Sequence, residues 1–180
     1  MEWLNSAQVG TKIGLIGPRP HFIPNFTAKK HVVMFADDTA VPALYSILKQ
    51  WELGISADIF IESFEKDIAS QLPELDHVKI HSFHKEHHSS QKGLLLKAAF
   101  TLENYENITI WAACERNEAR ALRQFFLEDQ QLNKNDVRIA GYWRAGVSSS
   151  ELDKLRAQHY QEHIQQGKTL NEYDDLDLAN

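Results

Sequence analysis

The 180-residue sequence is 43% hydrophobic, which is enough for one domain with a well-buried core and too little for two. The formal net charge of −6 argues against a nucleic-acid-binding protein, since such a protein needs a basic surface. No stretch approaches the ~20 apolar residues that span a bilayer, and the single cysteine, Cys114, excludes an internal disulfide framework. We therefore expect a cytoplasmic protein with no membrane span.

The first 30 residues resemble a connector more than a folding unit. We expect a strand over residues 12–17, because Pro18 ends this apolar run and the prolines that follow keep the chain extended. The segment begins abruptly and contains too few apolar residues to fold alone. It is either a piece from which a preceding part has been cut away or a natural start.

From residue 31 onward, strand-like runs alternate with helical stretches, which is typical of parallel βαβ units. The expected strands cover residues 32–36, 57–62, 77–83, 108–113 and 137–141. The expected helices cover residues 39–51, 64–72, 93–100, 117–130 and 151–166, and an acidic tail follows. These elements predict an α/β fold with an open five-stranded parallel sheet, helices on both faces, and a ligand at the carboxyl ends of the strands.

The corner after the strand at residues 32–36 is the strongest single pattern. Asp37, Asp38 and Thr39 follow this apolar strand, and we expect Thr39 to cap the next helix. Pro42 falls within the first helical turn, where its missing N–H costs nothing. The corner is either an anion site or an ordinary βα corner whose Asp and Thr side chains are caps.

Histidines are concentrated in one short stretch, at positions 77, 81, 84, 87 and 88. On a strand, His77 and His81 share a face while His84 lies on the other, and no clear cysteine or carboxylate partner stands nearby in the sequence. We therefore predict no metal site among these histidines.

The single cysteine, Cys114, has no recognisable catalytic partners in the sequence. We expect it to be a buried structural thiol if it binds no ligand.

Four blocks of sequence occur in a fixed order: residues 17–19 (GPR), 36–43 (ADDTAVPA), 111–115 (WAACE) continuing into 120–123 (RALR), and 141–146 (GYWRAG). Together they resemble the siderophore-interacting protein family, over about residues 3–146. Members of that family are similar to ferredoxin-NADP reductases, in which a flavin-binding barrel precedes a nucleotide-binding α/β domain. The resemblance therefore implies NAD(P)H-dependent, flavin-mediated reduction of ferric siderophores.

The resemblance also implies a division of the chain. Residues 1–30 correspond to the end of the flavin barrel plus a connector, residues 31–147 to the nucleotide-binding domain, and residues 148–180 to a C-terminal helix and acidic tail. The family's flavin motif is absent from this sequence. FAD is thus expected only with a flavin domain outside this chain. That flavin domain would be a partner of this chain, and the oxidoreductase is incomplete without it.

The family's nucleotide site maps onto the strand ends. The implied contacts to NADPH or NADH come from Asp37, Asp38, Thr39, Lys85, Cys114 and Glu115. No side chain of this chain needs to be a catalytic acid or base, because the cofactors supply the chemistry. Ala36 and Cys114 stand where members usually carry glycine, which predicts weak nucleotide binding.

The last block predicts a substrate surface. Because ferric siderophores are often anionic, we expect Trp143, Arg144 and Lys154 to face the ferric siderophore. Trp143 packing the sheet edge, with Arg144 paired to an acid, is an equally simple interpretation. The alternative to the reductase is a non-catalytic α/β module that binds another ligand or a partner protein.

Overall fold

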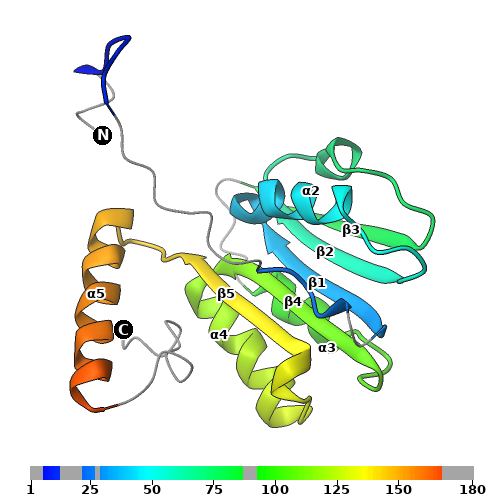
Figure 1. Ribbon diagram of the computed structural model, residues 1–180. Helices are drawn as coiled ribbons and strands as arrows, with labels where there is room; N and C mark the ends of the chain where they lie inside the picture. Colours follow the sequence, from blue (N-terminus) through cyan, green and yellow to red (C-terminus); the bar gives the residue numbers. More distant parts are fainter. Residues whose placement is uncertain (1–5, 13–21, 27–28, 87–92, 168–180) are drawn as a thin grey trace.

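The computed structural model describes residues 6–12, 22–26, 29–86 and 93–167. Its centre is a five-stranded parallel sheet in the order β3-β2-β1-β4-β5 (Figure 1). The strands are β1 (His31–Asp37), β2 (Ala57–Ser63), β3 (Val78–His84), β4 (Ile108–Glu115) and β5 (Val137–Trp143). The predicted α/β fold class is confirmed.

Burial explains why β1 and β4 occupy the middle of the sheet. Both are nearly continuous apolar runs whose residues are buried along almost their whole length, as expected when helices cover both faces. By contrast, β3 alternates half-buried and exposed residues, which suits an edge strand.

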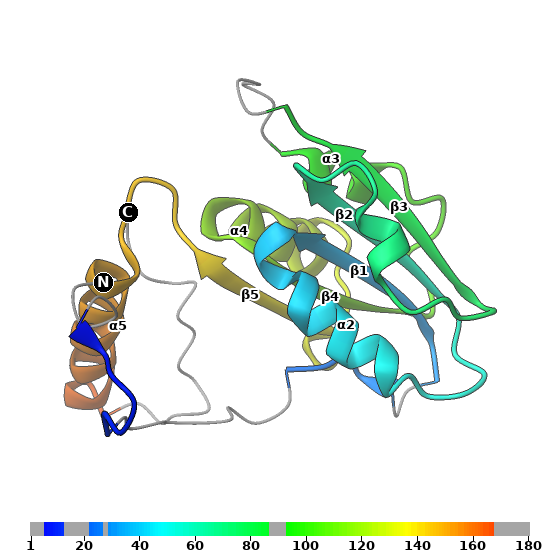
Figure 2. The same ribbon diagram turned by 90° about the horizontal axis from the view of Figure 1, so that it is seen from above.

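Helices cover both faces of this sheet, as the sequence predicts (Figure 2). One face packs against α2 (Val41–Lys49) through Leu44, Ile47 and Leu48. The other face packs against α3 (Leu94–Phe100) and α4 (Arg116–Gln124). Pro42 lies in the first turn of α2, as predicted.

The strand order creates a switch point beside β1. The chain runs outward from β1 to β3 and then returns to place β4 on the other side of β1. At such a point the loops that follow the two strands turn to opposite faces and leave a crevice at the carboxyl edge. Between β4 and β5 the register also shifts: Cys114 pairs with Gly141 but Glu115 pairs with Trp143, so β5 carries one extra residue here.

Two predicted helices differ from the structure. The helix expected over residues 64–72 is only a 3₁₀ turn at Ile68–Gln71, because few of its side chains are buried to support a longer helix. The helix expected over residues 117–130 begins at Arg116 and becomes a π-helix at Phe125–Asp129. Its wider turn accompanies the burial of two adjacent rings, Phe125 and Phe126. The strand expected over residues 12–17 lies almost wholly outside the described residues.

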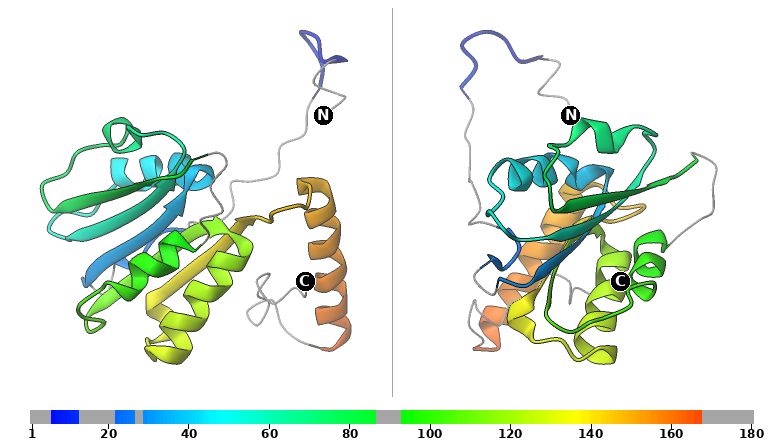
Figure 3. Two further views of the ribbon diagram at one scale, coloured as in Figure 1. Left: turned by 180° about the vertical axis from the view of Figure 1, so that it is seen from behind. Right: turned by 90° about the vertical axis from the view of Figure 1, so that its right-hand side faces the viewer.

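The C-terminal helix α5 (Ser149–Gln165) stands apart from the sheet (Figures 1 and 3). It begins with a capping box, in which the Ser148 hydroxyl and the Glu151 carboxylate each bond the other's backbone N–H. The Arg156 guanidinium donates to the Gly141 carbonyl at 3.0 Å and ties the helix to β5. No helix in the described part of the chain is long and apolar enough to cross a membrane.

Candidate functional site

The end of β1 is organised by the Asp37 carboxylate. Asp37 is 8% exposed, and its carboxylate accepts hydrogen bonds from the Thr39 backbone N–H at 2.9 Å and from the Thr39 hydroxyl. It also accepts from the Trp143 indole N–H at 2.7 Å. The predicted cap, Thr39, is therefore wrong: Asp37 caps the 3₁₀ turn Asp38–Ala40 that precedes α2, because it is the residue with extended backbone before the turn.

Asp38 points toward β2. Its carboxylate accepts from the Ser63 hydroxyl and from the Phe64 backbone N–H at 3.1 Å. Asp38 and Thr39 thus build the corner between the first two strands, and neither is among the residues that line the crevice described below.

The start of α4 is capped by its own acid, Glu115. The Glu115 carboxylate accepts from the backbone N–H groups of Asn117 and Glu118 at 2.7 and 3.3 Å. It also accepts from the Ala145 N–H at 3.1 Å, which holds the loop after β5 against α4. These are the N–H groups that an anion would otherwise contact at a helix start.

Glu118, also on α4, caps the start of α3 with its side chain. Its Oε1 accepts from the N–H groups of Leu95 and Leu96 at 2.9 and 3.2 Å. Burial raises the pKa of Glu118 and the nearby Glu62 adds to this effect, although the two backbone hydrogen bonds and Lys85 oppose it. Sequence reasoning missed Glu118, although it lies three residues after Glu115 on α4.

These corners enclose one crevice of about 320 Å³ at the carboxyl edge of the sheet. The strand-edge crevice is lined by Asp37, Glu62, Lys85, Gly93, Leu96, Glu115, Asn117, Glu118, Ala121, Trp143 and Ala145. The structure thus brings together four of the predicted site residues: Asp37, Lys85, Glu115 and Trp143.

The crevice is strongly acidic. Among its described lining residues, four carry carboxylates and one carries an ammonium. That ammonium, on Lys85, is paired with the Glu62 carboxylate through Oε1. Glu62 is only 5% exposed, and its Oε2 has no hydrogen-bond partner among the described residues. Glu62 lies near the end of β2, so the predicted ligand site at the carboxyl ends of the strands already included its position, although not its pairing with Lys85.

Cys114 is buried in the core and is not among the residues that line the strand-edge crevice. It is 0% exposed within the core that packs against α3 and α4. Burial raises the pKa of its thiol well above the ordinary value, and the surrounding carboxylates raise it further. These properties are those of a structural thiol.

Arg144 and Lys154 lie together in a second, more open hollow of about 480 Å³. This basic hollow lies between the loop after β5 and α5, and it is lined by Arg144, Gly146, Val147, Glu151, Lys154, Leu155 and Gln158. Trp143 therefore belongs to one hollow and Arg144 to the other. Both hollows meet at the end of β5.

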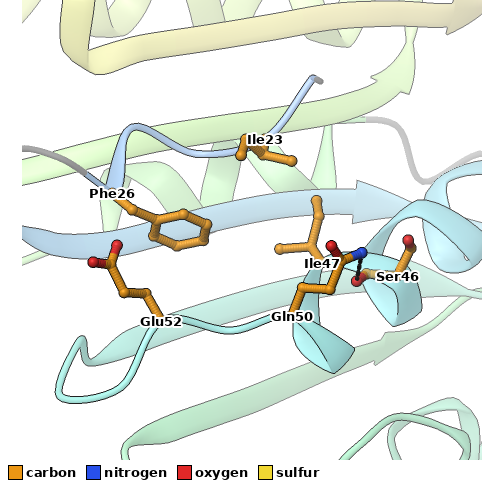
Figure 4. Close-up of a pocket in the computed structure, with 6 residues that line it drawn as sticks. All are labelled: Ile23, Phe26, Ser46, Ile47, Gln50 and Glu52. Carbon is orange, nitrogen blue, oxygen red and sulfur yellow. Dashed lines mark hydrogen bonds between the residues drawn. The ribbon is translucent and has the colours of Figure 1, made fainter. Parts of the chain in front are cut away.

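A further hollow of about 410 Å³ lies elsewhere in the fold (Figure 4). It is lined by Ile23, Phe26, Ser46, Ile47, Gln50 and Glu52. Because it lies at the last turn of α2 and the loop toward the start of β2, it is remote from the carboxyl edge and holds none of the predicted site residues.

The siderophore-interacting protein family matches residues 29–146, about two thirds of the chain. This chain belongs to that family. The matched region contains every strand of the sheet and the whole strand-edge crevice, but it ends before α5. The basic hollow therefore lies only partly within the family region.

Individual relatives agree with this assignment. The chain is 97% identical over its whole length to ferric acinetobactin reductase from Acinetobacter baumannii, and it spans 63% of the length of that protein. It is also 97% identical to a solved siderophore-interacting protein from the same species, with a TM-score of 0.84 over 92% of this chain and 66% of the other. A siderophore utilization protein from T. fusca has 29% identity and a TM-score of 0.56 over 66% of this chain and 46% of the other.

Histidines outside these hollows form one notable group. Asp58 on β2 accepts hydrogen bonds from His31 on β1 at 3.0 Å and from His81 on β3 at 2.7 Å. Burial opposes the ionisation of Asp58, but the hydrogen bond from His81 and the charges of both histidines hold its pKa below the ordinary value. The partner was missed because it stands on a neighbouring strand. No group of three metal-ligating side chains occurs in the described residues, and positions 87 and 88 lie outside them.

The residues of the strand-edge crevice suit only part of a nicotinamide nucleotide. Trp143, Leu96 and Ala121 would give its ring an apolar wall, and the carboxylates would accept from its carboxamide N–H groups. The phosphates do not fit as well, because the chain's own carboxylates already accept from the N–H groups at the helix starts and repel a second anion.

Proposed function

We propose that this chain is the nicotinamide-binding domain of a ferric-siderophore reductase, which acts together with a flavin-binding domain. The observation that carries the proposal is the 97% identity to ferric acinetobactin reductase across all 180 residues. The proposed substrate is accordingly ferric acinetobactin. Since the chain spans 63% of that relative's length, the remaining part is where a flavin domain would lie.

The proposed roles follow the two hollows. The strand-edge crevice would hold the nicotinamide ring of NADPH or NADH against Trp143, whose indole is fixed by Asp37. A bound nicotinamide supplies a hydride, which flavin chemistry converts into single electrons for iron. The residues of this chain bind and orient, and none of them acts as an acid or base.

The basic hollow would attract the ferric chelate. Arg144 and Lys154 give this hollow two positive charges against the one carboxylate of Glu151, in a chain whose net charge is −6. Such a local field raises the concentration of an anionic ligand near the site and weakens with salt. Trp143 and Arg144 are consecutive residues, so the ring site and the chelate site would be adjacent.

The test restores the complete enzyme by placing the family's flavin domain ahead of residue 3. Reduction of ferric acinetobactin by NADPH and NADH is then measured for the unmutated fusion, for Arg144→Ala and for Lys79→Ala. Lys79 is an exposed lysine on β3 and is the matched control. We expect slower reduction and a weaker salt dependence only for Arg144→Ala.

Two outcomes would contradict the proposal. If the fusion reduces no ferric acinetobactin with either nucleotide, the chain is better described as a binding module. If Arg144→Ala and Lys79→Ala behave alike, the chelate binds elsewhere.

A further inference from the structure

We propose that Trp111 and Arg138 form a clamp on the connector, residues 22–26, and that this clamp fixes the orientation of the flavin domain relative to the sheet. Both are positioning residues for hydride transfer, and neither lines the strand-edge crevice. The proposal rests on the proposed function, because it assumes that a flavin domain precedes the connector.

The clamp consists of two hydrogen-bond donors side by side on neighbouring strands. Trp111 on β4 and Arg138 on β5 are paired in register, so their side chains leave the same face of the sheet. The Trp111 indole N–H donates to the Phe22 carbonyl at 3.1 Å. The Arg138 guanidinium donates to the Ile23 carbonyl, also at 3.1 Å. Two adjacent side chains thus hold two consecutive carbonyls of the connector.

The indole hydrogen bond couples the connector to the core of the domain. Trp111 is 0% exposed, and a buried indole N–H needs an acceptor. The acceptor comes from Phe22, whose ring also packs 5.3 Å from the Trp111 ring, measured between centroids. Ile23 and Phe26 pack against the same core cluster. Displacing the connector would leave the indole donor unpaired, so the sheet and the connector stabilise each other.

The connector runs antiparallel to β5 and therefore enters at the carboxyl edge of the sheet. Its later end is bonded beside the start of β5, where the Asn25 side chain donates to the Asn135 carbonyl at 3.2 Å. Its earlier end lies beside the end of β5, where the Phe22 ring is 6.4 Å from the Tyr142 ring. Tyr142 precedes Trp143, where the two hollows meet. The connector thus begins at the edge that carries both proposed sites.

The sequence before Phe22 leaves the preceding domain little freedom. Only four residues, two of them prolines, separate residue 22 from residue 17, where the expected strand at the end of the flavin barrel stops. Such a stretch reaches at most ~18 Å, and its prolines stiffen it. Holding residues 22–26 therefore restricts where the flavin can lie relative to the crevice.

Hydride transfer depends strongly on this placement. A hydride that passes from NADPH or NADH to the flavin oxidises the nicotinamide and reduces the flavin by two electrons, and the reacting atoms must approach to about 3–3.5 Å. A loosened connector should therefore slow the transfer without weakening nucleotide binding.

The first test is structural and needs no turnover. It compares the complete protein, with the flavin domain ahead of residue 3, with its Arg138→Ala variant by NMR. Solvent exchange of the Trp111 indole N–H should accelerate about tenfold, because the neighbouring hydrogen bond from a charged donor is lost. Backbone amide relaxation should show the two domains tumbling together in the unmutated protein and separately in the variant. The Trp143 indole N–H, bonded to Asp37, is the internal reference.

The second test measures flavin reduction by NADPH and NADH in the same proteins. Arg138→Ala should lower the rate at saturating nucleotide several-fold and leave the half-saturating concentration unchanged. Arg138→Lys restores a donor and should recover part of the rate. Trp111→Phe keeps a ring but removes the N–H, and should also lower the rate. Lys79→Ala, an exposed substitution on the opposite edge strand, is the matched control.

Three outcomes would overturn the proposal. In the first, indole exchange and tumbling of Arg138→Ala match those of Lys79→Ala. In the second, the connector loosens but the rate at saturating nucleotide stays the same. In the third, the half-saturating concentration rises and nothing else changes. If neither nucleotide reduces the flavin of the unmutated protein, the proposed function fails, and exchange and tumbling still decide whether the clamp orients the flavin domain.

Discussion

The strand-edge crevice and the basic hollow have opposite charge, although they meet at two consecutive residues of one strand. Trp143 lines the crevice with four carboxylates around it, and Arg144 lines the hollow with Lys154. Under the proposed function, an anionic chelate would be repelled from the crevice and attracted to the basic hollow. The end of β5 would then separate two ligands by charge, with each site discriminating against the other's ligand.

The two regions also differ in how they are built. The crevice carboxylates are bonded to backbone N–H groups of the sheet and helices, so they support the fold as well as a ligand. Lys154 stands on an exposed face of α5 outside the sheet. Substitutions of the crevice carboxylates should therefore change stability, whereas substitution of Lys154 in the basic hollow should change binding alone.

Asp37→Ala should have the largest effect. It removes the acceptor of three hydrogen bonds, from the Thr39 N–H, the Thr39 hydroxyl and the Trp143 indole, at a site that is 8% exposed. We expect a loss of about 1–3 kcal/mol in the free energy of unfolding, measured with urea, and a change in Trp143 fluorescence. Asp37→Asn retains a side-chain oxygen and should lose less. An unchanged unfolding midpoint for Asp37→Ala would show that the crevice does not support the fold.

Glu115→Ala should have the next largest effect. It removes the cap of α4 and the contact to the Ala145 N–H, for an expected loss of about 1 kcal/mol. Hydrogen exchange should accelerate at the Asn117 and Ala145 amides. Ser148→Ala, which removes the cap of α5, is the comparison from the other region and should leave those two amides unchanged.

Lys154→Ala should weaken the binding of an anionic ferric chelate only a few-fold, because exposed charges contribute about 0.2–1 kcal/mol each. The measurement is chelate affinity at low and high salt, with Lys79→Ala as the control. The unfolding free energy should stay the same. A loss of stability as large as that of Glu115→Ala would remove the distinction between the two regions.

Glu118→Gln should have the smallest effect, on the pH dependence of stability. Because the pKa of Glu118 is raised above its ordinary value of 4.5, the folded protein binds this proton more tightly than the unfolded chain does. The stability from this group is fully present below pH 4.5 and is lost as the pH rises through the folded pKa. The Gln variant should lack that decline in thermal unfolding scans above pH 4.5. If the unmutated chain and Glu118→Gln show the same dependence of stability on pH, this prediction is wrong.

The sheet was predictable because its information is local. The alternation of apolar runs and helical stretches after residue 31 located every strand and most helices, and parallel strands must end at one edge. Asp37, Lys85, Glu115 and Trp143 could therefore be placed near one another. The sequence could not predict which residue caps the turn after β1. Asp37 and Thr39 are both good caps, and only the backbone conformation distinguishes them.

Three side-chain arrangements that the sequence did not predict depend on contacts between distant segments. Glu118 accepts from the start of α3 only because α3 and α4 pack side by side on one face of the sheet. Glu62 pairs with Lys85 across two neighbouring strands. Likewise, Asp58 reaches histidines on both adjacent strands. No spacing along the chain encodes these three arrangements.

The register shift between β4 and β5 has an evolutionary consequence. Because Tyr142 is the extra residue of β5 opposite Glu115, the loss of its codon would remove the bulge and leave Gly141 opposite Cys114 and Trp143 opposite Glu115. Trp143 would therefore keep its partner, whereas the local bend and extra twist that a bulge gives a strand would be lost. The bulge is thus a place where one insertion or deletion can re-aim the loop after β5, which carries Arg144, without changing the pairing of the sheet.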